Sequence, residues 1–225
     1  MFLPRFNVNG ALSECTRTAK WKVTYILDTL VDAFYALFTD CKSHEIEVGF
    51  LVDGSASVQL AFFQTMKDFI KNLTNLFDVS NVQTRVGVIV YSTNSTLVFP
   101  LNQYSTSNEI QQAVDNMEYP GGGTNTGQAL NDSVTTLFNN SIVRANVSKI
   151  LVVITDGVST DDVTEPAALV RGSGVTTFVI GIGKDFDHSQ LTRVALDDEN
   201  HVFTSEFSSL GDVTSNVRGA ICQGD

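Results

Sequence analysis

Hydrophobic residues from position 41 onward form two alternating patterns. Continuous apolar runs of about eight residues alternate with segments in which apolar residues recur at the spacing of a helix face. The continuous runs predict strands that are buried on both faces. These strands are expected at Ile46–Asp53, Arg85–Ser92, Ser95–Leu101, Ser148–Gly157, Val175–Gly183 and His201–Glu206.

The segments with helical spacing predict the helices. They are expected at Val58–Phe77, Thr106–Met117, Thr126–Phe138, Asp162–Gly174, Asp187–Leu196 and Phe207–Cys222. The buried face of the first should carry Leu60, Phe63, Met66, Phe69, Ile70 and Leu73, and that of the last Phe207, Leu210, Val213, Val217 and Ile221. A cap is expected near Ser107 or Asn108. The acids Asp161, Asp162 and Glu165 should lie at the start of the helix at 162–174, where the macrodipole favours them.

The order of these elements predicts the fold class. Buried strands that alternate with helices are typical of an α/β fold, in which a doubly wound, mostly parallel sheet is flanked by helices on both faces. The segment Ser95–Leu101 contains Pro100 and is therefore expected at the edge of the sheet.

Residues 1–40 do not follow this pattern. The first residues lack the basic start and apolar core of a secretory signal. The apolar stretch Val23–Phe38 contains Asp28 and Asp32 and is too short and too polar to span a bilayer. We expect a helical or poorly ordered extension at 1–40, a domain at 41–225 and no insertion into a membrane.

The composition narrows the choice of partner. The 225 residues are 43% hydrophobic and 17% charged, so the chain can fill a core, and their formal net charge is -11. This charge argues against nucleic acid and against anionic membrane surfaces as partners.

Cysteines and N-glycosylation sequons indicate whether the protein is located inside or outside the cell. In an oxidising compartment, a bond between Cys41 and Cys222 would join the two ends of the domain, and Cys15 would be unpaired or bonded to another chain. The alternative is three unrelated buried thiols. Sequons favour a secreted glycoprotein. They lie at Asn72, Asn94, Asn131, Asn139 and Asn146.

Oxygen-bearing side chains gather where the predicted strands end. In parallel sheets, ligands bind beyond the carboxyl ends of the strands. The candidates at this edge are Asp53, Ser55, Ser57, Thr124 and Asp156. Oxygen donors of this kind suit a hard dication such as Mg²⁺, with room for a carboxylate from a partner. The alternative is that the two aspartates only cap helices.

The motifs "DGSAS", "GGGTNTGQAL" and "ITDG" occur in this order and together resemble the metal-ion-dependent adhesion site of von Willebrand factor type A domains. The resemblance covers about residues 41–222, and the chain is most similar to the A domains of collagen VI and matrilins. It implies that Ser55, Ser57 and Thr124 contact the metal directly and that Asp53 and Asp156 act through water. The implied ion is Mg²⁺, with Mn²⁺ or Ca²⁺ as alternatives.

The resemblance also implies the function. We expect a secreted, extracellular matrix module that binds collagen or another matrix protein through an acidic side chain of that partner. The alternative is a structural matrix module that self-assembles without using the metal. An enzyme is not expected, because His44, His188 and His201 have neither metal spacing nor a nucleophile-elbow serine motif near them, and no set of nucleophile, base and acid can be built from the sequence.

Overall fold

The computed structural model describes residues 45–139 and 141–223. These residues build a six-stranded sheet with the order β3-β2-β1-β4-β5-β6. The strands are β1 (Ile46–Asp53), β2 (Thr84–Tyr91), β3 (Ser95–Phe99), β4 (Ser148–Thr155), β5 (Val175–Ile182) and β6 (Val202–Ser205). All neighbouring pairs are parallel except β2 and β3, and β3 lies at the edge as predicted.

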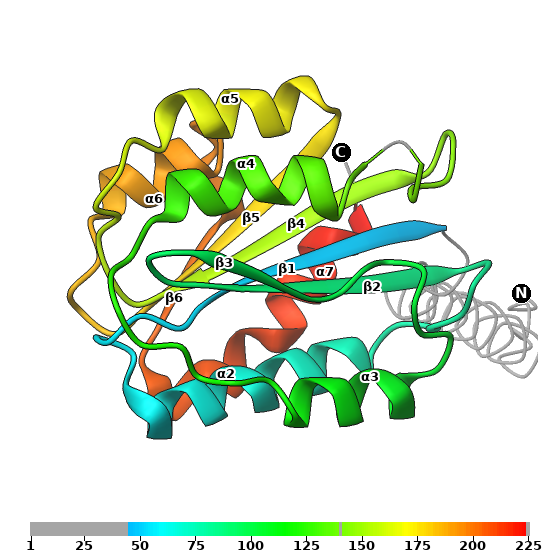
Figure 1. Ribbon diagram of the computed structural model, residues 1–225, viewed down its shortest axis with the longest axis horizontal. Helices are drawn as coiled ribbons and strands as arrows, with labels where there is room; N and C mark the ends of the chain where they lie inside the picture. Colours follow the sequence, from blue (N-terminus) through cyan, green and yellow to red (C-terminus); the bar gives the residue numbers. More distant parts are fainter. Residues whose placement is uncertain (1–44, 140, 224–225) are drawn as a thin grey trace, which may run out of the picture. The chain divides into compact units, whose positions relative to one another are not determined.

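Helices cover both faces of this sheet, as Figure 1 shows. One face carries α4 (Thr126–Thr136), α5 (Thr164–Gly172) and α6 (His188–Val194). The other carries α2 (Gln59–Thr74), α3 (Ser107–Asp115) and α7 (Thr214–Gln223). Two short 3-10 helices, η2 (Glu199–His201) and η3 (Phe207–Val213), complete the described elements. The predicted doubly wound α/β class is therefore confirmed.

The core forms because the central strands are apolar on both faces. Every residue of β1 is buried, and one of its faces contributes Leu51 to a cluster that includes Ile89 of β2 and Val153 of β4. Helices α4 and α5 pack onto this cluster through residues such as Leu130 and Val170. Burial of this kind supplies most of the driving force for folding and holds the strand ends in register.

Three details differ from the sequence prediction. Leu60 is 67% exposed, because it lies in the first turn of α2 and at the margin of the buried stripe. Helix α3 is capped by Thr106, one residue before the predicted cap, since Thr106 and Glu109 form a capping box. The segment Phe207–Val213 is a 3-10 helix that leads into α7. Its serines and Gly211 are poor formers of a regular α-helix.

Candidate metal centre

Three loops meet at the carboxyl end of the sheet, on the left of Figure 1. The strands β1 and β4 are neighbours and run parallel, so their ends bring Asp53 and Asp156 to one edge. Thr124 lies in the third loop, which joins α3 to α4. The three predicted motifs thus come from separate parts of the chain and reach the same end of the domain.

The glycine-rich loop is held against the segment that follows β1. The Gly121 N–H donates to the Gly54 carbonyl (2.9 Å), and the Ala56 N–H donates to the Gly122 carbonyl (3.0 Å). Gly121 and Gly122 have φ values of 63° and 99°. L-residues rarely adopt this region, so glycine is what allows the loop to turn and approach so closely.

A chain of hydrogen bonds joins four of the five candidate ligands. The Ser55 N–H donates to Asp53 Oδ1 (2.8 Å), and the Ser55 and Ser57 hydroxyls are 2.9 Å apart. The Ser57 hydroxyl donates to Asp156 Oδ1 (2.8 Å). The second oxygen of Asp53, Oδ2, accepts a bond from the Thr155 hydroxyl (2.7 Å). Each side chain therefore has a fixed orientation.

Thr124 completes the set from the third loop. Its side chain is buried, and its backbone carbonyl accepts a hydrogen bond from the Thr160 N–H (2.7 Å). Within residues 45–139 and 141–223, the hydrogen bonds of Thr124 go to its backbone carbonyl, and its hydroxyl makes none. This hydroxyl is thus available to a ligand.

The two carboxylates are buried, and no basic side chain of residues 45–139 and 141–223 balances their charge. Asp53 is 0% exposed and Asp156 is 7% exposed. Burial raises the pKa of Asp53. Burial also raises the pKa of Asp156 to about 6, against the hydrogen bond from Ser57, and the charge of Asp53 adds to the rise. No Lys, Arg or His of the described part of the chain forms an ion pair with either one.

These features fit a hard dication. Buried, like-charged carboxylates are costly alone and are stabilised by a positive ion between them. The donor set offers only oxygen, which suits Mg²⁺, Mn²⁺ or Ca²⁺. In the parts of the chain that the structure describes, no group of three or more His, Cys, Asp or Glu side chains could hold a metal. A metal at this edge would thus depend on hydroxyls as well as on carboxylates.

Sequence reasoning missed the residues that support the site. Thr155 bonds to Asp53, and the Tyr119 hydroxyl donates to the Ser55 carbonyl (3.0 Å). Asp161 bonds to the start of α4. The prediction assigned Asp161 to the helix that follows it, which is wrong, because Asp162 is the residue that accepts the Thr164 N–H at the start of α5 (3.2 Å). Of these supporting residues, Thr155 is the one that the sequence could have indicated, because it lies inside the "ITDG" motif.

Several predictions fall outside the described residues or are not tested. Cys15, Cys41 and the extension at 1–40 lie outside them, so the Cys41–Cys222 bond and the domain boundary stay predictions. The sequon asparagines are described and lie at the surface, Asn131 being half-buried, and their glycosylation stays a prediction. Among the described helices, none has the length and apolar character needed to cross a membrane.

Comparisons with known proteins agree with this geometry. The von Willebrand factor type A domain model matches residues 47–216. Human collagen alpha-6(VI) chain is 31% identical over 203 residues, which are 89% of this chain and 9% of the relative. Human matrilin-4 is 35% identical over 81% of this chain and 30% of its own length.

Solved structures agree as well. Proximal thread matrix protein 1 from the mussel byssus is 27% identical, with a TM-score of 0.75. In that structure, zinc occupies the metal-ion-dependent adhesion site (MIDAS) motif. The match covers 82% of this chain and 47% of that protein.

The chain spans no more than 30% of the length of the curated relatives reported above. The homologues are secreted extracellular matrix proteins with structural and adhesive roles, which agrees with the predicted location. The match of the family model over 47–216 and the sequence identity to these relatives lead to one assignment. The chain belongs to the von Willebrand factor type A domain family.

Proposed function

We propose that this domain is an extracellular protein-binding module whose adhesion depends on a divalent cation. The observation that carries the proposal is a pair of buried carboxylates, Asp53 and Asp156, which hydrogen bonds of Ser55 and Ser57 join and which have no Lys, Arg or His counter-charge among the described residues. A site of this kind is stabilised when a dication balances the two charges.

Each of the five side chains has a separate role in this proposal. The hydroxyls of Ser55, Ser57 and Thr124 contact the ion, and Asp53 and Asp156 orient these groups and act on the ion through water. When bound, the ion supplies a Lewis-acidic position that an acidic side chain of the partner can fill. Mg²⁺ is the proposed ion, and Mn²⁺ or Ca²⁺ would suit the same oxygen donors.

The proposed partner is a protein of the extracellular matrix, such as a collagen. This follows from the relatives, whose names include collagen VI chains and matrilins. The formal net charge of -11 is unfavourable for a strongly acidic partner surface, so one carboxylate in an otherwise neutral or basic segment is the expected epitope.

The test is binding of the purified chain to immobilised collagens and other matrix proteins, with Mg²⁺ and with EDTA. EDTA should abolish binding, and Thr124→Ala should weaken it by about tenfold or more. Thr135→Ala is the matched control, since Thr135 is an exposed threonine near the end of α4 and should change nothing.

Binding that persists in EDTA would refute the adhesion mechanism. If the chain also self-associates equally with and without metal, the alternative of a structural module that assembles without its metal site would be the better account.

A further inference from the structure

The start of helix α4 is capped by a loop that lies far away in the sequence. Its own N-cap residue, Asn125, makes no side-chain hydrogen bond to the helix. Instead, the Gly127 N–H donates to Asp161 Oδ1 (2.8 Å) and the Gln128 N–H donates to Asp161 Oδ2 (2.7 Å). One carboxylate thereby satisfies two of the N–H groups that a helix leaves unpaired at its start.

Ser159 extends this contact. Its hydroxyl accepts a hydrogen bond from the Thr126 N–H (3.0 Å) and donates to Asp161 Oδ1 (2.6 Å). Its own N–H donates to the Gln190 side chain of α6 (2.7 Å). The loop that follows Asp156 is thus fixed to α6 on one side and to the first turn of α4 on the other.

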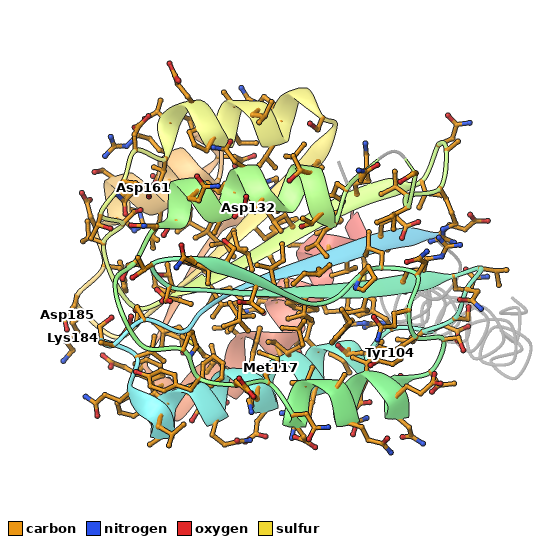
Figure 2. The ribbon with its side chains drawn as sticks, viewed as in Figure 1. Tyr104, Met117, Asp132, Asp161, Lys184 and Asp185 are labelled. Atoms are coloured by element: carbon orange, nitrogen blue, oxygen red, sulfur yellow. The ribbon has the colours of Figure 1, made fainter. Side chains whose placement is uncertain are left out.

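The same loop also holds Thr124, which lies two residues before the first residue of α4. The Thr160 N–H and the Thr160 hydroxyl both donate to the Thr124 carbonyl, at 2.7 Å and 3.0 Å. The packing leaves no spare room, because a Cβ added at Gly127 would clash with the Asp162 carbonyl. Figure 2 shows Asp161 at the end of the domain where α4 begins.

We propose that Asp161 and Ser159 form a clamp that positions Thr124 for the metal. Asp161 is then a positioning residue, because it fixes the start of α4. The fixed helix start and Thr160 together hold the Thr124 backbone in place. The Thr124 hydroxyl is thereby presented to the ion. This inference rests on the proposed metal-dependent function. It extends that function to residues outside the five candidate ligands.

The clamp has a defined energetic signature. Residues that orient metal ligands typically change metal affinity by about 10–100-fold when removed. Because Asp161 is proposed to act through Thr124, its effect on metal affinity should vanish once the Thr124 hydroxyl is gone. A merely structural residue would lower stability equally in both backgrounds and would not show this dependence.

The experiment is a double-mutant cycle on the full chain. Mn²⁺ affinity is measured by calorimetry for the unsubstituted chain, Asp161→Ala, Thr124→Ala and the double variant. Asp161→Ala should weaken Mn²⁺ binding by about tenfold or more alone, and by less than about twofold in the Thr124→Ala background. Asp161→Asn, which keeps one acceptor oxygen, should have an intermediate effect.

Asp162→Asn is the matched control, since it removes the neighbouring charge, keeps an oxygen that can accept the Thr164 N–H at the start of α5, and does not reach α4. It should leave Mn²⁺ affinity within about twofold of the unsubstituted chain. Equal losses for Asp161→Ala in both backgrounds, or no loss in either, would overturn the inference.

Hydrogen exchange in EDTA separates this inference from the proposed function. In the metal-free chain, Asp161→Ala should accelerate exchange of the amides at 126–128, and Asp162→Asn should not. An unsubstituted chain that binds no Mn²⁺ would refute the proposed function and the metal part of the inference. Unchanged exchange in Asp161→Ala would refute the clamp whether or not the chain binds metal.

Discussion

In the metal-free domain, Asp156→Asn should raise stability at neutral pH. Asp156 is 7% exposed, and burial and the nearby Asp53 charge raise its pKa from 3.8 to about 6. Ionising such a group at pH 7 costs the folded state about 3 kcal/mol relative to the unfolded chain, because each pKa unit corresponds to about 1.36 kcal/mol. Asparagine keeps the size of the side chain and an oxygen that can accept the Ser57 hydroxyl, and it removes the charge.

The sign of the pH dependence follows from the raised pKa. The folded state holds the proton more tightly than the unfolded chain, so the contribution of Asp156 is most favourable below pH 3.8 and is lost as the pH rises through about 6. The stability advantage of Asp156→Asn should therefore be about 1–3 kcal/mol at pH 7 and should shrink to near zero by about pH 4.

Urea unfolding in EDTA, followed by far-UV circular dichroism between pH 4 and 7.5, measures this difference. Asp162→Asn is a control of opposite sign, since hydrogen bonds from Thr164 lower the pKa of Asp162 and its contribution is lost in acid. With Mg²⁺ at 100 times its Kd, the unsubstituted chain should gain about 2.7 kcal/mol and the Asp156→Asn variant much less. Equal or lower stability of Asp156→Asn at pH 7 in EDTA would refute the reasoning.

Three further substitutions test the surrounding structure by urea unfolding. Arg144→Ala should lower the free energy of unfolding by about 3 kcal/mol or more, because Arg144 Nε lies 2.7 Å from a carboxylate oxygen of the fully buried Glu47. The same substitution should cost less in a Glu47→Gln background, where the buried charge is already gone, and an equal cost there would contradict the prediction. Gln59→Gly should stabilise the domain by about 0.5–1 kcal/mol, because Gln59 has a φ of 58° that glycine adopts freely; a lower unfolding midpoint would contradict this. Gly127→Ala should cost about 3 kcal/mol or more, or prevent folding, because its Cβ would clash with the Asp162 carbonyl; a loss below about 1 kcal/mol would mean that the loop can move away.

The strands were predictable because their apolar runs are dictated by burial on both faces. The predicted bounds of β1, Ile46–Asp53, are those of the structure, and every residue of that strand is buried. Helices were predicted less well at their ends, where local capping decides. Thr106 rather than Ser107 caps α3 because Glu109 is three residues further on. Spacing alone also placed Leu60 on a buried face, although burial of a first-turn residue depends on what packs over it.

The candidate ligands were predictable for a different reason from the residues that hold them. Asp53 ends β1 and Asp156 directly follows β4, and parallel strands necessarily bring their carboxyl ends to one edge. The hydrogen bonds that support these ligands do not follow from the order of the strands. Thr155 bonds to Asp53 across 102 positions, and Asp161 bonds to Gly127 across 34. In the sequence, Asp161 resembles an ordinary acid at the start of the following helix.

Two neighbouring acids share the helix starts near them, and only the fold decides which acid caps which helix. Asp162 accepts the Thr164 N–H of α5, so the Asp161 carboxylate is free to bond to α4. Both helix starts gain a negative charge, which their dipoles favour. The pair also joins the Asp156 loop to the Thr124 loop, which no local pattern can indicate. The support of the metal centre is therefore a property of the packed domain, whereas its candidate ligands are a property of the sequence motifs.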